Sequence, residues 1–479
     1  MIPSLNHYYV ARLTLETATP LSITAGGTDG VFDTVLVRDV NGLPTLPGSA
    51  VAGVLRHLFW ELFTEEDMHQ VFGFQQQDTG AFSKLQVSWG YIQDSHGQPI
   101  EGLRYGNIQD PLLQAALAER EFPVHRDQVR ISHRGVIDQR GKFDRTVLPA
   151  GYRFSVELVL WSAINSDPYW QQVLALLKHP LFRLGGNTHA GLGALKLIKA
   201  HTGHFDLTDT KQRDAFTRLA RSIGSTQGLT ALVPKTIDVA KEERFVTAIL
   251  HLTPRDFWRI GQGEHPNQID LNGKFADILP KLEKRVVWEN NIGKFTAANL
   301  LVPASSVKGA LAHRVAFHAN CRAGRWATVD KLTNYAKEDD PEIRELFGFA
   351  GHDNSMAVGR VGRVLLNDAF VAFTPNDIQI MMHNAVDRFT GGVREHMLFS
   401  EELVWHKPIE MQIIIDTQGI GATARDALQL ALQDLCQGRL SLGSGMAKGH
   451  GLFTGTVTWS DGGQFIPNIV APNTKRAAS

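Results

Sequence analysis

LPGSAVAGVLRH at Leu46–His57 returns as VPASSVKGALAH at Val302–His313, and this repeated stretch decides the fold. Two more landmarks follow each copy in the same order: VFGF at 71–74 and LFGF at 346–349, then the glycine-rich turns GGNTHAGLG at 185–193 and GSGMAKGHG at 443–451. Three landmarks in one order indicate a module that is written twice. The length of 479 residues accommodates two such modules.

Each copy of the repeated stretch has the pattern of a helix start. Ser49 in the first copy, and Ser305 or Ser306 in the second, are expected to cap a helix in which apolar residues recur at helical spacing. Both helices carry a glycine one turn in, Gly53 and Gly309, which costs about 1 kcal/mol relative to alanine. The duplicated glycine indicates that either the sheet or a bound backbone packs tightly on that face, although a duplicated structural requirement predicts the same pattern.

Strand patterns divide the chain further. Alternating apolar and β-branched residues open each half, in HYYVARLTLETATPLSI and in ERFVTAILHLTP at Glu243–Pro254. Between them, a helical pattern around Gln212–Ile223 precedes the turn-rich GSTQGLTALVPKT. We therefore predict a first domain at 1–202, a connecting helix and linker at 203–242, a second domain at 243–462 and a mobile tail at 463–479.

Charge restricts the class of protein. The formal net charge of −1 argues against a free-standing nucleic-acid binder, since such proteins are usually basic. A local strip between Arg120 and Arg145 is nevertheless rich in cations and poor in acids, and it includes Arg126, Arg130, Arg134, Arg140, Lys142, His125 and His133. Such a strip could hold a phosphate backbone along one face, and a solvated surface loop is the alternative.

Cysteine content and hydropathy indicate the compartment. Cys321 and Cys436 are too few for a disulfide framework or a zinc site, which fits a reducing cytosol. The opening MIPSLNHYYV lacks the features of a secretory signal, and no stretch approaches the roughly 20 apolar residues that cross a bilayer. We expect a cytoplasmic protein without membrane partners.

The glycine-rich turns are the first candidate binding elements. Each turn lies between two strand-like segments, which is a hairpin context and differs from the strand-to-helix loops that bind nucleotides. Successive backbone N–H groups in such loops could cradle phosphates, with His189, Lys448 and His450 adding donors or positive charge. Ordinary tight turns are the alternative.

A loop rich in aspartate and glycine is the second candidate. The segment ITAGGTDGVFDTVLVRDVNG contains Asp29, Asp33 and Asp39 between the first strand and LPGS. A carboxylate there could hold a divalent ion or assist proton transfer, and Mg²⁺ needs only one carboxylate when phosphate oxygens complete its shell. Turn formation is the alternative role.

Two basic excursions form the third candidate. Ile131–Leu158 and His383–Ile414 each combine a glycine-broken basic stretch with a following strand, which predicts a projecting hairpin. Arg134, Arg388 and Arg394 could stack on bases or clamp phosphates. A solvated hairpin without a partner is the alternative, and the sequence has neither a His/Cys metal signature nor a G-x-S-x-G elbow.

Together these features resemble the RAMP (repeat-associated mysterious protein) superfamily of CRISPR systems, in particular the backbone subunits of type III effector complexes. The marks of that family are a loop aspartate, an IPGSSLKGALR-like helix start, FG before a strand, a thumb hairpin and a C-terminal glycine-rich loop. The first half matches them with Asp33, LPGSAVAGVLRH, VFGF, the 130–145 excursion and GGNTHAGLG. The second half matches with VPASSVKGALAH, LFGF, DRFTGG and GSGMAKGHG. The chain looks like two backbone subunits fused.

The resemblance implies an α+β fold of two tandem ferredoxin-like, RRM-like domains, each with an antiparallel sheet, helices on one face and an inserted thumb hairpin. The implied partners are CRISPR RNA, complementary target RNA, other RAMP subunits and the large subunit of a type III complex. The implied RNA-binding residues lie on helix starts, thumbs and glycine-rich loops: Ser49, Arg56, Lys308, Arg130, His133, Arg134, Arg140, Arg388, Arg394, Gly185, Gly186, His189, Gly191, Gly443, Gly445, Lys448, Gly449 and His450.

The resemblance also implies catalysis. Asp33, fourteen residues before Pro47, stands where the aspartate of the family stands, and it would cleave target RNA with Mg²⁺ or Mn²⁺ as the divalent cofactor. A 2′-hydroxyl next to a displaced nucleotide would attack its own phosphate, which confines the reaction to RNA. In the longer second half, Asp270 is favoured because it aligns with Asp33 from the strand start, while Asp277 and Glu289 remain open.

Three alternatives stand beside this interpretation. The first is a non-catalytic scaffold that organises guide and target RNA. The second is an endoribonuclease that processes CRISPR RNA, with His189 or His450 as the residue to test. The third is a duplicated α+β assembly protein without RNA, which only the near-neutral charge supports.

Overall fold

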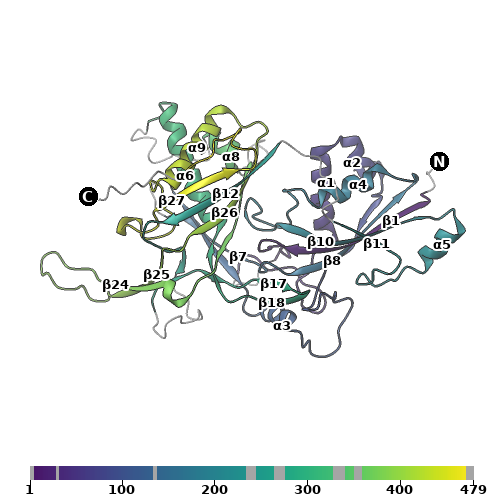
Figure 1. Ribbon diagram of the computed structural model, residues 1–479, viewed down its shortest axis with the longest axis horizontal. Helices are drawn as coiled ribbons and strands as arrows, with labels where there is room; N and C mark the ends of the chain where they lie inside the picture. The colour runs from purple at the N-terminus through teal and green to yellow at the C-terminus, as the bar shows by residue number, and fades with distance from the viewer. Residues whose placement is uncertain are drawn as a thin grey trace.

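The computed structural model describes residues 5–27, 32–132, 137–233, 244–263, 276–326, 340–349 and 359–470. Two α+β units lie side by side, the first toward the N-terminus and the second toward the C-terminus (Figure 1). Each unit has its own antiparallel sheet and its own buried apolar cluster. The predicted α+β class is confirmed, and none of the described helices has the length and apolar character that a bilayer span requires.

The first unit has the ferredoxin-like strand order. Its sheet runs β10 (Leu195–Asp206), β1 (His7–Thr17), β8 (Arg153–Ser162), β4 (Leu85–Val87), with α1 (Gly48–Leu62) after β1 and α4 (Pro168–Leu176) after β8. Apolar residues at helical spacing on α1, such as Val51, Leu55 and Leu58, are fully buried in the core beneath this sheet. The strand order and the two crossovers therefore give one sheet with its helices in a common core.

The second unit repeats that topology. Its sheet runs β27 (Phe453–Trp459), β12 (Phe245–Pro254), β26 (Ile409–Asp416), β22 (Val364–Asn367), with α6 (Ala304–Arg322) and α9 (Ala422–Cys436) as the two crossover helices. Small apolar residues of α9, including Ala424, Ala427 and Ala431, are buried where it packs on α6 and β27. The expected tandem of ferredoxin-like folds is confirmed.

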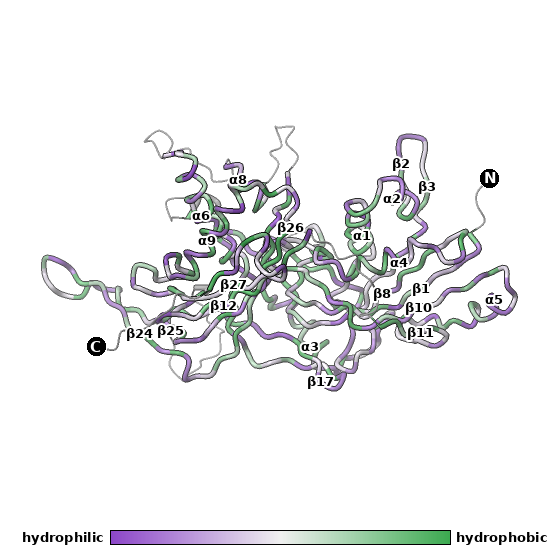
Figure 2. The backbone as a smooth tube through the Cα atoms, turned by 45° about the horizontal axis from the view of Figure 1, so that its top comes forward, coloured by the Kyte–Doolittle hydropathy of each residue, from purple (hydrophilic) through white to green (hydrophobic). Residues whose placement is uncertain are grey.

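Shorter elements complete each unit. The FG landmarks end helices, because Gly73 and Gly348 adopt φ values of +69° and +78° after α2 and α8, where a Cβ would lie 2.4 Å from a backbone oxygen. The remaining elements are α2 (Glu65–Phe72), α3 (Pro111–Ala118), α8 (Pro341–Phe347), β2 (Phe74–Gln76), β3 (Thr79–Ala81), β5 (Tyr91–Ile92), β13 (Phe257–Trp258), β14 (Gly261–Gly263), β15 (Leu279–Pro280), β16 (Leu282–Glu283), β19 (Asn299–Val302), β20 (Gly348–Phe349), β21 (Arg360–Val361) and β23 (Ala369–Val371). Figure 2 shows that hydrophobic segments gather inside both units, while the projecting β2–β3 hairpin is hydrophilic.

The connection between the units packs against the first sheet. It contains α5 (Thr210–Thr217) and β11 (Thr230–Leu232), and β11 extends the sheet beside β10. Phe216 of α5 joins Tyr8, Val10 and Phe205 in a second apolar cluster, on the sheet face opposite α1 and α4. Arg12 on that face donates to the carbonyl oxygens of residues 225 and 220 at 2.7 and 2.6 Å. The described part of the linker therefore covers a face that an RRM-like sheet would otherwise expose.

The start of the predicted mobile tail is packed. Ile466 and Ile469 are buried in the second core, and Ile469 exchanges backbone hydrogen bonds with Val457 of β27. Burial of two isoleucines stabilises residues 463–470 against β27, which the low-hydropathy composition of the segment did not predict. Residues 471–479 lie outside the described residues.

The extra length of the second half before VPASS forms a hairpin that enters the first unit. This clasp hairpin consists of β17 (Val286–Glu289) and β18 (Ile292–Phe295), which lie beside α3 (Figure 1). The Trp288 indole donates to the Gly151 carbonyl at 2.8 Å, and the Arg153 guanidinium lies 4.0 Å from the centre of that ring. Val286 is buried in the core of the first unit. The two units therefore share packing, and they are not joined only by a linker.

Candidate nucleic-acid interface

The two repeated helices begin earlier than the sequence predicts, by two residues in the first copy and by two or three in the second. Pro47 and Pro303 occupy the N-cap positions in extended conformations, and no side chain caps either helix. The prediction that Ser49, Ser305 or Ser306 caps is therefore wrong, because these serines already lie within the first turn. Among them Ser49 and Ser306 are exposed, so their hydroxyls are available to a ligand at the positive end of a helix.

Exposed residues form a stripe along α1. Ser49, Gly53, Arg56 and Trp60 follow at helical spacing, and all four are exposed. No described atom lies within 4 Å of the place where a Cβ would stand on Gly53 or on Gly309. The sheet therefore does not pack against either glycine, which leaves open the interpretation that a bound backbone does.

The first thumb consists of β6 (His125–Ile131) and β7 (Ile137–Thr146), and it reaches across to the second unit. Its Arg126 is buried, and it forms ion pairs with Glu283, at 3.0 Å, and with Asp368. Both acids belong to the second unit and are themselves buried. Lys281 donates to the carbonyl of His125 at 3.0 Å, and burial lowers the pKa of this lysine to about 8. This group of charges holds the thumb in place.

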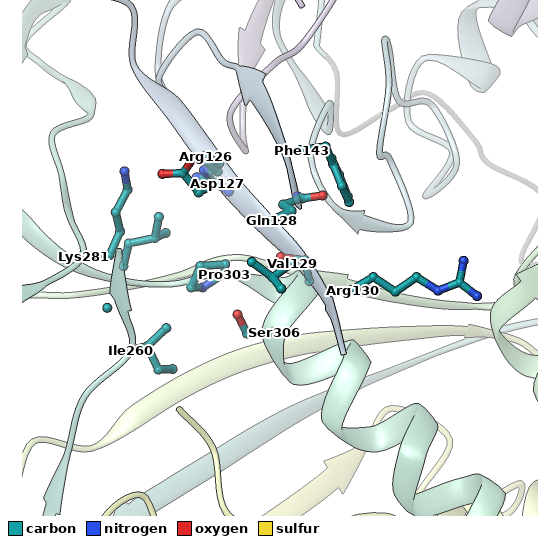
Figure 3. A pocket seen from close by; sticks show the side chains of 13 residues that line it. Arg126, Asp127, Gln128, Val129, Arg130, Phe143, Ile260, Lys281, Pro303 and Ser306 are labelled. Atoms are coloured by element: carbon teal, nitrogen blue, oxygen red, sulfur yellow. The ribbon is translucent and has the colours of Figure 1, made fainter. Parts of the chain in front are cut away.

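A pocket of about 420 Å³ lies between this thumb and the start of α6. Figure 3 shows β6 passing the first turn of α6, with Val129 near Ser306, while Arg130 extends away from Lys281. Phe143 also lines the pocket and is 42% exposed. The pocket therefore combines cations, hydroxyls and an aromatic ring, which suit phosphate and a nucleobase.

The predicted catalytic residue Asp33 lies at the base of the first thumb. Its backbone N–H donates to Asp144 Oδ1 at 2.9 Å, and the N–H of Asp144 donates to Asp33 Oδ2 at 3.1 Å. The side chain of Asp33 is exposed, and the ring of its neighbour Phe32 lies against His125. The structure therefore brings two carboxylates together beside β7, and the sequence had singled out only one of them.

A reciprocal contact of the same kind occurs at the second thumb, formed by β24 (Ile378–His383) and β25 (Phe399–Trp405). The N–H of Asp277 donates to the Ser400 hydroxyl at 3.1 Å, and the N–H of Ser400 donates to Asp277 Oδ2 at 2.7 Å. Hydrogen bonds from the backbone and hydroxyl of Ser400 lower the pKa of the Asp277 carboxyl. By contact geometry, Asp277 is the counterpart of Asp33, and Ser400 that of Asp144.

The other two acids considered for the second half lie elsewhere. Asp270, which spacing favoured, lies outside the described residues. Glu289 lies on the clasp hairpin and forms an exposed ion pair with Lys294 at 2.6 Å. Spacing in the sequence could not identify which acid corresponds to Asp33, because the clasp hairpin adds residues between the acidic segment and α6.

The two glycine-rich loops have the same backbone hydrogen bonds. Gly186 N–H donates to the Ser22 carbonyl, and Ser444 N–H donates to the Arg259 carbonyl. In each loop, further backbone hydrogen bonds at matching positions close the turn. The first loop lies in the seam between the units, where Ala190–Gly191 (β9) pairs in parallel with β22. The second loop is largely exposed. The glycines predicted to bind phosphate therefore lie in two different surroundings. The seam contains Gly185, Gly186 and Gly191, and the largely exposed second loop contains Gly443, Gly445 and Gly449.

The charged residues of these loops are engaged within the protein. Lys308 donates to the His189 carbonyl at 3.2 Å, and burial lowers the pKa of Lys308 to about 8 and that of His189 to about 3. Lys448 donates to the buried Glu401 at 3.0 Å. His450 is buried with its ring against Phe257. His189 is therefore neutral near pH 7 and would act toward RNA only as a neutral donor or acceptor.

The second thumb projects from the molecule as a long loop (Figure 1). At its tip Asp387 accepts the N–H groups of Phe389 and Thr390, which forms a turn that leaves Phe389 fully exposed. Arg388 is exposed, and Arg394 lies 3.7 Å from Asp387. In the first thumb, His133 and Arg134 and the side chain of Arg140 lie outside the described residues.

A comparison with protein families identifies the repeated unit. The sequence profile of the RAMP superfamily matches residues 14–196 and again residues 297–454. A search of curated proteins found no match. The two matched regions contain both repeated helices and both glycine-rich loops, together with β4 and β8 of the first sheet and β22 and β26 of the second. The chain therefore belongs to the RAMP superfamily of CRISPR-associated proteins and carries two RAMP domains in tandem.

Proposed function

We propose that this chain is a double backbone subunit of a type III CRISPR effector complex, which binds CRISPR RNA and cleaves complementary target RNA. The observation that carries the proposal is the duplicated aspartate at the thumb base, Asp33 with Asp144 and Asp277 with Ser400. An exposed carboxylate held rigidly against a thumb is suited to act on a phosphodiester that the thumb positions. CRISPR RNA, target RNA, further RAMP subunits and a large subunit are the proposed partners.

The RNA would lie along protein surfaces where the helix backbone is accessible and positive charge is present. The α1 stripe provides a hydroxyl on Ser49, an open approach at Gly53 and the Arg56 guanidinium. The pocket beside α6 provides Phe143 for stacking and Arg130 for phosphate. The guide backbone would follow these helix starts, and the thumbs would separate successive segments of the duplex.

The chemistry follows from the groups at the first thumb base. The 2′-oxygen of the target forms a bond to the adjacent phosphorus, the bond from phosphorus to the 5′-oxygen breaks, and the leaving oxygen gains a proton. Asp33 can accept the proton of the 2′-hydroxyl. Its carboxylate and that of Asp144 are oxygen donors that fit Mg²⁺ or Mn²⁺, which would neutralise phosphate charge when bound. The Asp277 site has Ser400 where the first site has Asp144, so it offers one carboxylate.

Cleavage by the reconstituted complex, with guide RNA, Mg²⁺ and end-labelled target, tests this function. Asp277→Ala is expected to slow the formation of one discrete cleavage product by about 10²-fold or more. The affinity for target RNA is expected to stay unchanged, because only a group at the reacting phosphate is lost. Asp270→Ala is the matched variant and is expected to leave all products. An unchanged ladder in Asp277→Ala would leave the second unit as a binding unit.

Alanine at the helix glycines separates folding from RNA binding. Gly53→Ala and Gly309→Ala are expected to raise stability, by up to about 1 kcal/mol each, because the helices gain propensity and the added methyl meets open space. The same variants are expected to weaken guide-RNA binding, because the methyl blocks close approach of the RNA backbone. Thermal unfolding and filter binding measure the two effects. Improved stability with unchanged affinity would remove these helix faces from the RNA path.

A further inference from the structure

Another cavity, of about 270 Å³, lies on the face of the first sheet opposite α1 and α4. Its floor consists of side chains that alternate with the core residues along β1, β8 and β10. Its walls come from residues 96–99 after β5, residues 223, 224 and 226 of the linker, and Asn291 at the turn of the clasp hairpin. The first unit, the linker and the second unit therefore build this cavity together.

Hydrogen bonds hold the walls in place. The Glu101 carboxylate accepts the Ser222 hydroxyl at 2.7 Å and the backbone N–H groups of the next two residues, which fixes the linker. The N–H of Gly293 donates to the carbonyl of Ser95 at 2.8 Å, which fixes the clasp hairpin against the loop after β5. The cavity is therefore formed before any ligand binds, which reduces the cost of ordering it.

Hydrogen-bond donors form a row across the floor. Ser155, Thr14 and Lys199 stand side by side in the register of β8, β1 and β10, and all three line the cavity. The buried amide of Gln93 donates to both hydroxyls, at 2.8 Å to Ser155 and at 3.3 Å to Thr14. Because each hydroxyl already accepts a hydrogen bond, its own proton can be donated to a group in the cavity.

Positive charge surrounds this row. Arg153 is buried and donates through Nε to Glu16 at 2.8 Å, while its terminal N–H groups have no hydrogen-bond partner in the described part of the chain. Lys199 and His201 form no ion pair with any described residue. Burial, and then the charge of Lys199, lower the pKa of His201. No described aspartate or glutamate lines the cavity, so its lining favours an anion.

We propose that this cavity binds a phosphate group, either as the free ion or as part of a small phosphorylated molecule. Phosphate oxygens accept hydrogen bonds in several directions, which suits two hydroxyls, a guanidinium and an ammonium group. The volume lies below the range of about 300–1,000 Å³ that is typical of sites for drug-sized ligands, so the occupant is small. The cavity lies on the sheet face away from α1, and the inference rests on neither RNA binding nor cleavage.

Isothermal titration calorimetry of the full chain without RNA tests this proposal, with inorganic phosphate, ribose 5-phosphate and ribose as titrants. Both phosphate compounds are expected to bind at one site per chain, and ribose is expected not to bind. Tighter binding of ribose 5-phosphate would assign the cavity to phosphorylated small molecules. Tighter binding of inorganic phosphate would assign it to the free ion.

Two lysines of β10 provide a matched pair of variants. Lys199→Met is expected to weaken binding of both phosphate compounds at least about tenfold, because a charge-assisted hydrogen bond is lost. Lys196→Met removes the same charge from an exposed position that does not line the cavity, and it is expected to change affinity less than about twofold. Lys199→Arg keeps the charge and is expected to retain most of the affinity.

Equal thermal unfolding of these variants without ligand would show that the fold is intact. The absence of saturable binding by either phosphate compound would overturn the proposal. Equal losses in Lys196→Met and Lys199→Met would also overturn it, because they would indicate attraction to the whole surface. So would binding of ribose as tight as that of ribose 5-phosphate.

Discussion

Asp33→Asn is expected to lower the rate of target-RNA cleavage beside the first thumb by about 10²–10⁴-fold, with guide and target affinity unchanged. The amide oxygen can still accept the Asp144 N–H, which lies 3.1 Å from the carboxylate in the wild type, so the thumb base keeps its shape. What the variant loses is the negative charge that would accept a proton or bind the divalent ion. Single-turnover cleavage of an end-labelled target, with products mapped to the nucleotide, measures the effect.

The matched control lies six residues further along the same loop. Asp39 has its carboxylate engaged by the N–H groups of Asn41 and Leu43 at 2.8 and 2.9 Å, and an asparagine there keeps the accepting oxygen. Asp39→Asn is therefore expected to leave cleavage unchanged. Equal losses in both variants would indicate a loop that is only structural, and no loss in Asp33→Asn would move the active site elsewhere. Full cleavage in the double variant Asp33→Asn/Asp277→Ala would favour the scaffold alternative.

Arg126→Met is expected to destabilise the protein by about 3–5 kcal/mol. The substitution leaves Glu283 and Asp368 buried without their counter-charge, and desolvation then acts on both carboxylates unopposed by Arg126. Burial raises the pKa of Glu283 overall, and the positive charges of Arg126 and Lys281 partly oppose that rise. Urea unfolding, followed by tryptophan fluorescence, measures the change through the shift in midpoint.

Neutralising the acids tests the physical cause. Arg126→Met combined with Glu283→Gln and Asp368→Asn is expected to recover most of the lost stability, because no unpaired charge remains buried. Arg130→Met, four residues along the same strand and exposed, is expected to change stability by less than about 0.5 kcal/mol. If Arg126→Met unfolded at the wild-type midpoint, the thumb would be held by something other than this charge group.

Local patterns predicted much of the fold because they are set by neighbours in sequence. The repeated helix start, the FG landmark and the glycine-rich turn each encode a backbone conformation, such as the left-handed glycines at 73 and 348. They recur in order, so the tandem arrangement followed from them, whereas the ferredoxin-like fold was implied by the resemblance to the RAMP superfamily. The serine caps failed because the proline before each helix takes the cap position itself.

The candidate site was predicted less completely. Asp33 was predicted because it stands where the aspartate of the RAMP family stands, and its contact with Asp144 at the thumb base is consistent with that prediction. Asp144 was missed, although it stands in the predicted thumb, because nothing local distinguishes it from other surface acids. Lys308 and His189 were grouped as RNA ligands, and the structure joins them to each other across the seam between the units. No alternation or spacing in the sequence reports such a contact.

The sequence by itself determined that the chain is one α+β module written twice, with an acidic loop, a thumb and a glycine-rich turn in each copy. Only the tertiary structure decided that Asp277 faces its thumb as Asp33 does, that the extra segment is a clasp hairpin, and that Arg126 is buried against Glu283 and Asp368. The physical reason is range. Backbone conformation and amphipathic pattern depend on residues a few positions apart, whereas the burial and pairing of a charge depend on groups brought together from more than a hundred residues away.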